Sequence, residues 1–585
     1  GATTRIGSAW SNGFPDRSRQ LVIAENFEQS TQLNAKELII NSGVNLSISN
    51  NLLVVSDALV NNGVVRMIAA SQLVQTHTNT TLVSGAGNLQ IDQLGTLASI
   101  YRFNYWTAPV VENGSSTFSI GAVMKDGTSP TSSSSEITDI NFVGGYDGAN
   151  TSPISIASYW LYSYANAGWI RTGNTGDLNP ADGYLLKGPG VAQNYTFVGS
   201  PNDGEIISSI AANTSKLIGN PYPSALDATK FIRDNSAVID GTLYFWEHTG
   251  ELATTTATQG HNRGGYIGGY STRNLSMGIA ANTVAEGTGG LGSATYQAPG
   301  RFIAIAQGFF IGGSEIGGNI MFNNSQRAYQ PLDGSSAVFF KGAVSLANTT
   351  LNAQLPIVKL GLEYTNKEGQ TLHRQIGISF KEGNTDAYES GYDSEIYDLN
   401  TDENDMYWNF GEAKNYVIAG VEAFDKGLEI PITLQIKSAT PIAIKLDAFE
   451  HIEGPICFYD SLFNTNVDLK KETAISLSLL KGNYTNRFYL RFKETTLSVE
   501  EHKLTTEIQL YYSKNNRALH IESKKGEIQK VTLYNNVGQQ CQQWDVAPNI
   551  QSSVKLMVKT LSTGLYIVKI KTKAAAIIKK IVIHR

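Results

Sequence analysis

Between Leu33 and Leu89 the chain alternates very short apolar runs with turn residues, and this pattern restricts its possible folds more than any other feature. Pairs such as Ser42-Gly43 and Asn62-Gly63 separate the runs, and they supply the positive φ that tight corners require. Strands this short cannot bury a face alone. We therefore expect them to stack as coils of a β-helix or to form a small sandwich, and we prefer the solenoid.

The composition favours strands in the rest of the chain as well. Charged residues make up 16% of the sequence, against about 25% in average soluble proteins. Asn, Ser, Thr and Gly take their place, and the side chains of Asn and Ser compete with the helical backbone for hydrogen bonds. The sequence predicts an all-β protein: an N-terminal β-helix-like region, β-sandwich domains, and a small C-terminal Ig-like β-sandwich.

A chain of 585 residues is longer than a single hydrophobic core usually supports. Aromatic-rich strands, such as the one expected over 159–162, mark a second domain. The predicted segments are a β-helix-like region (1–100), an aromatic-rich β domain with a long Gly/Thr-rich insertion (101–346), a β-sandwich (347–493), a polar linker (494–503) and a C-terminal domain (504–585).

The charge is distributed unevenly between the C-terminal segment and the rest. Residues 501–585 contain 14 Lys and Arg against 5 Asp and Glu, a net charge of +9, whereas the remainder holds 31 against 46, a net charge of -15. The lysines of the basic segment alternate with apolar residues, as in Val568, Lys569, Ile570 and Lys571. This is the pattern of a solvated sheet face, so we expect no nucleic-acid partner.

Two further features of the sequence argue against a membrane-spanning helix and against a disulfide. No run of about 20 apolar residues is present, so no membrane-spanning helix is predicted. The two cysteines, Cys457 and Cys541, fall in different predicted domains, and we expect no disulfide between them.

Three phrases near the C terminus occur in a fixed order: LYNNVGQ (533–539), LSTGLYIVKI (561–570) and KKIVI (579–583). Together they resemble the type A C-terminal sorting domain of type IX secretion substrates. The residues that carry this signal are Leu533, Tyr534, Asn535, Val537, Gly538, Gln539, Gly564, Tyr566, Val568, Lys579, Lys580 and Ile581.

The resemblance implies how the chain leaves the cell. It implies passage through the periplasm, recognition by an outer-membrane shuttle protein, and export through the type IX translocon to the outer cell surface or the medium. A sorting peptidase would cleave in or near the linker, and the body would become a candidate for attachment to lipopolysaccharide.

Four phrases in the body resemble the mosaic surface proteins of gliding and biofilm-forming Bacteroidetes. They are AWSNGFPD (9–16), FNYWTAPV (103–110), IGNPYPSALD (218–227) and AQGFFIGG (306–313). This resemblance implies a class of exported surface proteins and no particular activity. Within that class we expect a non-catalytic adhesin or extracellular matrix protein, associated with gliding motility. The alternative is a secreted polysaccharide-binding or polysaccharide-degrading protein with the same export signal.

Recognisable catalytic patterns are missing from the sequence. None of the eight histidines has a partner at zincin spacing, and no GxSxG nucleophile elbow occurs. Gly287, Gly289 and Gly292 fit GxGxxG, but they lie in a Gly/Thr-rich stretch without the strand and helix that the fingerprint requires. We therefore expect no catalytic residues and no enzyme activity.

An acidic cluster provides the candidate metal site. Calcium is bound by six to eight oxygens from flexible loops, and the acidic body would gain from such neutralisation. We favour a solvated acidic loop over a calcium site, and we expect no other cofactor. The candidate ligands are Asp386, Asp393, Glu395, Asp398 and Asp402.

Aromatic side chains provide the candidate carbohydrate site, because the apolar C–H face of a pyranose packs on an aromatic ring. We favour burial in large cores over a sugar-binding surface for these rings. The candidates are Trp106, Tyr159, Trp160, Tyr162, Trp169 and Trp246.

Overall fold

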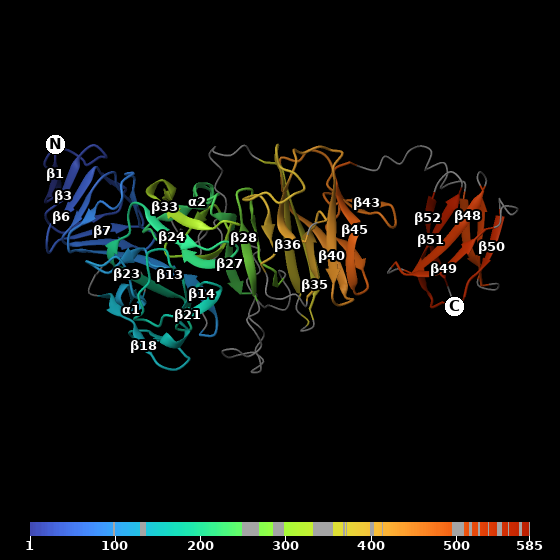
Figure 1. Cartoon of the computed structure of the whole chain (residues 1–585), viewed down its shortest axis with the longest axis horizontal. Coiled ribbons are helices and arrows are strands. Elements are labelled where there is room, and N and C mark those ends of the chain that lie inside the picture. The colour runs from blue at the N-terminus through green and yellow to red at the C-terminus, as the bar shows by residue number, and fades with distance from the viewer. Residues whose placement is uncertain are drawn as a thin grey trace. The chain divides into compact units, whose positions relative to one another are not determined.

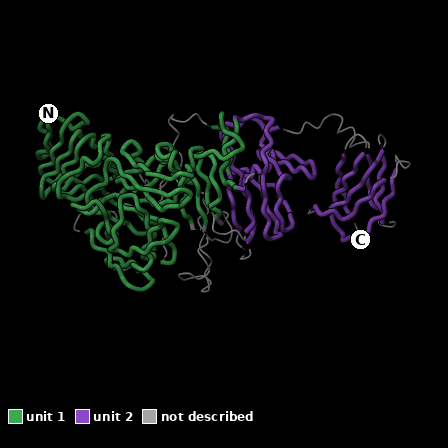
Figure 2. Tube along the Cα trace, viewed as in Figure 1, with its two compact units in different colours: residues 1–355, 377–400, 414–422 green, residues 356–376, 401–413, 423–585 purple. Residues whose placement is uncertain are grey.

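A computed structural model gives the structure of the protein. It describes residues 1–96, 100–128, 136–248, 268–284, 298–330, 355–366, 369, 371–397, 403–411, 413–493, 508–513, 517–523, 527–535, 538–546, 553–559, 561–572 and 576–583. Strands dominate these residues, which confirms the predicted all-β class (Figure 1). The chain divides into two compact units: unit 1 contains residues 1–355, 377–400 and 414–422, and unit 2 contains the rest (Figure 2). The five-segment division expected from the sequence stays a prediction.

Unit 1 begins with the expected parallel β-solenoid, whose coils add strands to three sheets. The first sheet contains β1 (Thr3–Ile6), β3 (Gln20–Ile23), β6 (Glu37–Ile40), β9 (Leu59–Asn61) and β12 (Val83–Ser84), all parallel. The second contains β4 (Phe27–Gln29), β7 (Asn45–Ser49), β10 (Val64–Ile68) and β13 (Asn88–Gly95). The third contains β5 (Leu33–Ala35), β8 (Leu52–Val55) and β11 (Gln72–Gln75).

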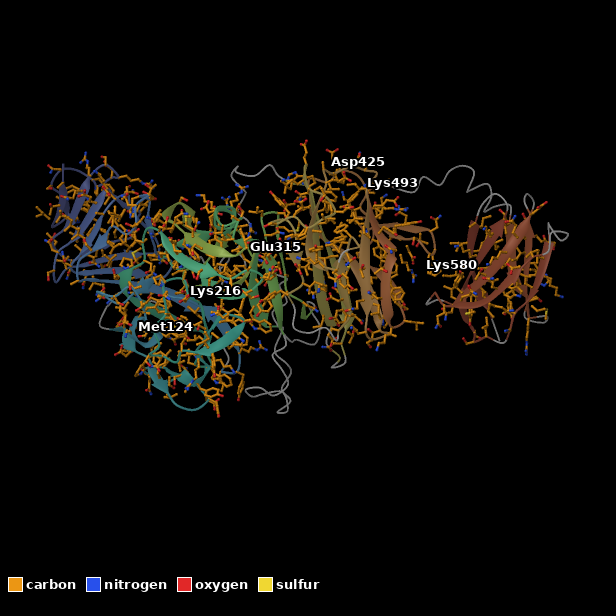
Figure 3. All side chains as sticks on the ribbon, viewed as in Figure 1. Met124, Lys216, Glu315, Asp425, Lys493 and Lys580 are labelled. Carbon is orange, nitrogen blue, oxygen red and sulfur yellow. The ribbon has the colours of Figure 1, made fainter. Side chains whose placement is uncertain are left out.

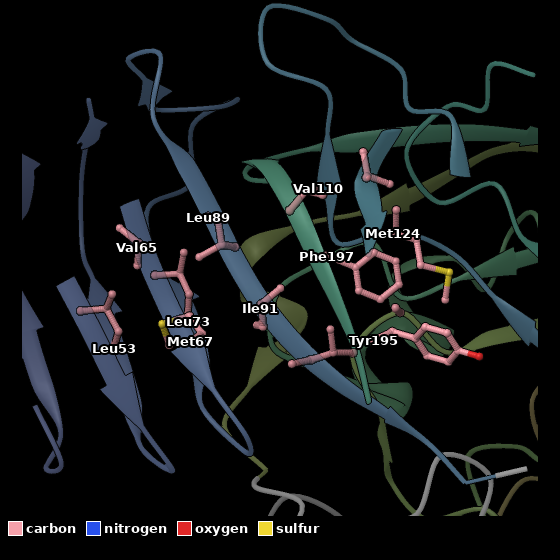
Figure 4. Packing of buried hydrophobic residues seen from close by; sticks show 14 of the residues in the cluster. Leu53, Val65, Met67, Leu73, Leu89, Ile91, Val110, Met124, Tyr195 and Phe197 are labelled. Atoms are coloured by element: carbon pink, nitrogen blue, oxygen red, sulfur yellow. The ribbon is translucent and has the colours of Figure 1, made fainter. Parts of the chain in front are cut away.

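The strand register stacks apolar residues in columns through the solenoid. Leu33, Leu53 and Leu73 pair in turn, and all three are fully buried. Val65 and Leu89 pair in a second column, and both columns belong to one core (Figure 4). Each short strand thus buries its face against the coils above and below it.

Aromatic residues cover the first coil. β2 (Ala9–Trp10) folds back antiparallel on β1. The Arg5 guanidinium lies 5.0 Å from the Trp10 ring centroid and 4.7 Å from that of Phe27, and the two rings meet edge to face at 5.4 Å. The AWSNGFPD phrase thus contributes β2 and Trp10 to the edge of the first sheet, where Trp10 packs against Arg5 and Phe27.

Strand β23 (Gln193–Pro201) pairs antiparallel with β13 and continues the second solenoid sheet through β16 (Met124–Asp126) and β17 (Thr138–Asp139). A buried ion pair lies at this junction. Both carboxylate oxygens of Asp92 accept from Nη2 of Arg66 at 2.8 Å, and each side chain is 1% exposed. Asp92 also accepts from the Thr196 hydroxyl at 2.7 Å and from the Ala69 amide at 2.9 Å.

Two further sheets complete the main framework of unit 1. One contains β14 (Phe103–Trp106), β22 (Tyr184–Lys187), β20 (Tyr162–Ala165) and β21 (Gly168–Arg171) in that order. The other contains β25 (Ser215–Gly219), β32 (Gly308–Gly313), β27 (Ile239–His248), β28 (Gly268–Arg273) and β29 (Gly278–Ile279). The helices α1 (Ile120–Val123) and α2 (Ala228–Asp234) are short. Residues 158–160 form a 3-10 turn rather than the expected strand, which begins only at Tyr162.

Three of the body phrases meet at one packing centre. Trp106 forms a β-bridge with Gln307. A Cβ on Gly308 would lie 2.7 Å from the Tyr105 carbonyl carbon, and one on Gly219 would lie 2.6 Å from Cγ2 of Thr107. The glycines therefore permit close backbone approach, and the phrases are recognisable because the fold needs them.

Unit 2 contains a β-sandwich-like set of antiparallel strands followed by the C-terminal domain. β35 (Ile357–Thr365) pairs with β41 (Pro441–Glu450), which pairs with β44 (Ile475–Ser478). A second set contains β38 (Asp405–Trp408), β40 (Glu429–Ile436), β45 (Gly482–Arg491), β42 (Cys457–Asp460) and β43 (Thr465–Asp468), in that order.

Candidate functional site

The C-terminal domain is a sandwich of two antiparallel sheets, with seven strands in its described residues. One sheet contains β46 (Ile508–Ser513), β47 (Ala518–Ser523) and β50 (Ser553–Met557). The other contains β49 (Gln540–Asp545), β48 (Ile528–Asn535), β51 (Gly564–Thr572) and β52 (Ala576–Ile583). The small C-terminal β-sandwich predicted from the sequence is therefore present. Its strand β49 reads QCQQWD, which lacks the apolar alternation of a typical strand.

This domain has a hydrophobic core of its own. All its buried members, from Ile508 to Ile583, and the half-buried side chains packed on them belong to the C-terminal segment. Leu533, Val568 and Ile570 are fully buried within it. The domain therefore meets the physical requirement for a separable export signal, a hydrophobic interior that the cargo does not share.

The sorting phrases occupy the four-stranded sheet. Leu533 pairs with Val568, and Tyr566 pairs with Ile581. The Tyr566 hydroxyl donates to the Ser562 carbonyl at 2.9 Å, which fixes the start of β51. These four side chains are all buried, so much of the recognisable signal specifies the fold of the domain.

The LYNNVGQ phrase also forms the turn between β48 and β49. The Gly538 amide donates to the Asn535 carbonyl at 3.1 Å, and Gly538 has a φ of +80°, which suits glycine. The Gln539 amide donates to the Asn535 side chain at 2.9 Å. Val537, another predicted signal residue, lies outside the described residues.

Two remaining signal residues occupy neighbouring positions of β52 and point to opposite sides of the sheet, since Lys579 pairs with the buried Val568 and Lys580 pairs with Ile567. Leu565 pairs with Val582, and both are exposed, by 45% and 48%. Ile567 pairs with Lys580, which Figure 3 labels, and Lys580 is exposed; the neighbouring Lys579 is half-buried. The outward face of β51 and β52 thus combines exposed apolar side chains with lysine, and we call it the basic face.

The three predicted metal ligands that the structure describes are not assembled into one site. The Asp393 carboxylate is buried and accepts from the backbone amides of Gly420, at 2.7 Å, and Glu389, at 2.5 Å. Glu395 forms an ion pair with Lys414, and Asp386 is exposed. Asp398 and Asp402 lie outside the described residues, and the described part of the chain holds no group of three potential His, Cys, Asp or Glu ligands.

Sequence reasoning missed two buried histidine clusters. In unit 1, Nε2 of His77 lies 2.8 Å from Oδ2 of Asp203, whose Oδ1 accepts from the Asn324 amide at 3.0 Å. Nη2 of Arg327 donates to the Leu73 carbonyl at 2.6 Å, and its guanidinium lies 4.8 Å from the Tyr222 ring centroid. Every member is buried, so the cluster joins the solenoid to the rest of the unit.

In unit 2, Nε2 of His373 lies 2.7 Å from Oδ2 of Asp447, and Nδ1 lies 3.6 Å from Oε1 of Glu363. Burial acts to lower the pKa of His373, but the hydrogen bond with Asp447 and the nearby Glu363 carboxylate outweigh burial and raise it. The close contact with His373, followed by the hydrogen bond from Lys445, lowers the pKa of Glu363 to about 2. No signal in one sequence pairs residues about 75 positions apart, which is why the cluster was not foreseen.

The aromatic candidates divide into a buried and an exposed group. Trp106, Trp160 and Trp246 are buried, as favoured from the sequence. Tyr159 and Trp169 are exposed by 36% and 45%, respectively. Tyr162, which follows the turn, is half-buried.

Comparisons with known proteins match two successive parts of the chain. Residues 514–584 match a family model described as secretion system C-terminal sorting domain. A search of curated proteins finds no match. Among the described residues, none of the helices has the length and apolar character required to cross a bilayer.

The sorting domain indicates that the type IX system exports the chain to the cell surface or the extracellular space. A second family model matches residues 6–492, so it spans the solenoid, the remainder of unit 1 and the sandwich strands. Because this match covers most of the sequence, the chain belongs to the family described as domain of unknown function DUF8693, joined here to a secretion system C-terminal sorting domain.

Proposed function

We propose that the chain is a non-catalytic surface protein of a Bacteroidetes bacterium, an adhesin or extracellular matrix component that the type IX system exports. The observation that carries the export part is the separate core of the C-terminal domain. A signal with its own interior can fold, bind the export machinery and be cleaved away without disturbing the cargo.

The structural use of the body's polar residues supports a scaffold role. Asp227 accepts from the amides of Thr229 and Lys230 at the start of α2 and binds Arg301 through both carboxylate oxygens. His77 and His373 are buried, and each is paired with an aspartate carboxylate. These groups maintain the fold, and a catalytic acid or base would need access to a substrate.

The partners proposed for the signal are the outer-membrane shuttle and the translocon, followed by the sorting peptidase and attachment to lipopolysaccharide. The basic face offers a contact of suitable chemistry for a partner with acidic and apolar side chains. Lys580 supplies charge there, and Leu565 and Val582 supply exposed apolar surface.

A fusion experiment tests the export signal. Residues 494–585 are attached to a periplasmic passenger protein in a bacterium with a type IX system, and the culture is separated into periplasm, surface and medium. We expect the passenger outside the cell. A matched fusion with Val568→Asp, which places a charge in the domain core, should stay in the periplasm. Retention of the unmodified fusion in the periplasm would contradict the proposal.

The alternative is a polysaccharide-binding or polysaccharide-degrading protein. Within this alternative, the exposure of Tyr159 and Trp169 favours a polysaccharide-binding protein over a polysaccharide-degrading one. A reducing-sugar assay on the purified chain distinguishes these two functions, since a degrading enzyme releases new reducing ends and a binding protein does not.

A further inference from the structure

Four side chains share one face of the edge hairpin β20–β21. In this antiparallel pair Tyr162 is opposite Arg171, and Tyr164 is opposite Trp169. Directly opposite residues, and residues two apart on one strand, point to the same side of a sheet. One face of the hairpin therefore carries three aromatic rings and a guanidinium. Tyr164 and Trp169 also pack against the buried Phe310, at 5.0 and 6.0 Å, while Trp169 stays 45% exposed.

The rings of the 3-10 turn extend this face. The Arg171 guanidinium lies 5.6 Å from the Tyr159 ring centroid. Tyr159 meets Tyr146 at 4.8 Å with an interplanar angle of 84°. Tyr146 is 57% exposed, so exposed aromatic surface runs from Tyr146 through Tyr159 and Arg171 to Trp169. We call these four side chains the aromatic strip.

Buried neighbours hold the rings of the strip in place. The indole N–H of Trp160 donates to the Tyr146 carbonyl at 2.8 Å, and its ring meets Tyr159 edge to face at 4.8 Å. At the other end, Trp169 meets Tyr164 at 5.1 Å. Rings fixed in this way lose little conformational freedom when a ligand stacks on them.

Charge on and around the strip favours a neutral ligand. The body outside residues 501–585 has a net charge of -15, which repels anionic polymers at long range. Lys187 is buried, with its Nζ 3.5 Å from the Trp160 ring centroid, and burial lowers its pKa to about 7 against the opposing effect of Asp147. Arg171 therefore carries the positive charge of the strip. The N–H groups of its planar guanidinium can donate hydrogen bonds to sugar hydroxyls as well as to carboxylates.

We propose that the aromatic strip binds an extended, neutral, β-linked polysaccharide. The exposed rings pack against the C–H faces of successive sugar units, and Arg171 donates hydrogen bonds to their hydroxyl groups. The inference rests on the proposed function as a surface protein and identifies what its body adheres to. Binding is measured on purified chain, so its failure is distinguishable from failure of the export signal.

Affinity electrophoresis of the full chain tests this proposal with two polymers of matched backbone. Hydroxyethylcellulose is neutral and carboxymethylcellulose is anionic. We expect retardation by hydroxyethylcellulose, little by carboxymethylcellulose, and little change between low and high salt. Failure of hydroxyethylcellulose to retard the chain, or stronger retardation by carboxymethylcellulose, overturns the proposal.

Substitutions on one strand supply the control. Trp169→Ala should weaken binding by about tenfold, the upper range for one aromatic contact. Ile170 is also exposed, by 49%, but points to the other side of β21. Ile170→Ala should therefore bind as the unmodified chain does. Equal loss in both variants, or equal binding by both, would show that the face carrying Trp169 does not hold the polymer.

Discussion

Replacement of Arg66 by methionine removes one partner of a buried ion pair and keeps most of the side-chain volume. Arg66 and Asp92 are each 1% exposed at their side chains, and the remaining donors to the carboxylate are Thr196 and Ala69. An uncompensated buried charge costs about 3–5 kcal/mol. We expect Arg66→Met to lower the local free energy of opening of β10 and β13 by about that amount.

Hydrogen exchange with mass spectrometry on peptides from residues 60–95 measures this quantity locally, which suits a chain of several domains whose unfolding is not a single transition. The double variant Arg66→Met/Asp92→Leu replaces both charges with apolar groups, and it should be more stable than Arg66→Met alone. We expect a coupling energy of about 2 kcal/mol between the two sites. Arg17→Met, at an exposed arginine, serves as the control.

Two results would refute this reasoning. One is a change of less than about 1 kcal/mol in Arg66→Met, which would mean that water reaches the carboxylate. The other is strict additivity of Arg66→Met and Asp92→Leu, which would mean that the two side chains do not stabilise each other.

Three further predictions concern other parts of the chain. The folded state favours protonated His373, so the stability that this residue contributes is complete below its ordinary pKa of 6.5 and is lost as the pH rises through its raised folded pKa. The folded state favours ionised Glu363, so the stability that this residue contributes is complete above its ordinary pKa of 4.5 and is lost as the pH falls through about 2. Denaturation of unit 2 should therefore show greatest stability from this cluster between about pH 4.5 and 6.5, and His373→Gln should flatten the profile. Gly308→Ala should destabilise unit 1 by about 1–3 kcal/mol in calorimetry, whereas Gly144→Ala, whose Cβ would meet open space, should leave the transition unchanged. Lys580→Glu should reduce export of the passenger fusion while its circular dichroism stays native; unchanged export would remove the basic face from the recognition surface.

Local patterns made the fold class predictable. In β47 the apolar residues Leu519 and Ile521 alternate with the polar residues His520 and Glu522, which is the pattern of a strand that buries every second side chain. The solenoid was predictable because coils with short strands repeat the same interior positions. The turn at Ser158–Trp160 was not, because aromatic residues favour strands and packing around Trp160 decided otherwise.

The candidate sites were less predictable, because they depend on contacts between distant residues. Trp106 and Trp169 belong to similar aromatic stretches, yet one is buried and the other exposed. Both lie on strands at the two ends of one sheet, β14 and β21, and Trp106 is buried because Tyr195 and Phe197 pack against it. Single-sequence periodicity does not report such contacts between distant residues. The same limit applies to Asp203, whose partners His77 and Asn324 are more than 100 positions away.

The parallel columns of the solenoid have a consequence for how the protein can change in length. Strands β4, β7, β10 and β13 begin at residues 27, 45, 64 and 88, so one turn takes up between 18 and 24 residues. A tandem genetic duplication of one such turn would continue every column and leave the antiparallel pairing of β23 with β13 as it is. Relatives that differ by whole turns would thus be tolerated, and the length of the solenoid could evolve in discrete steps.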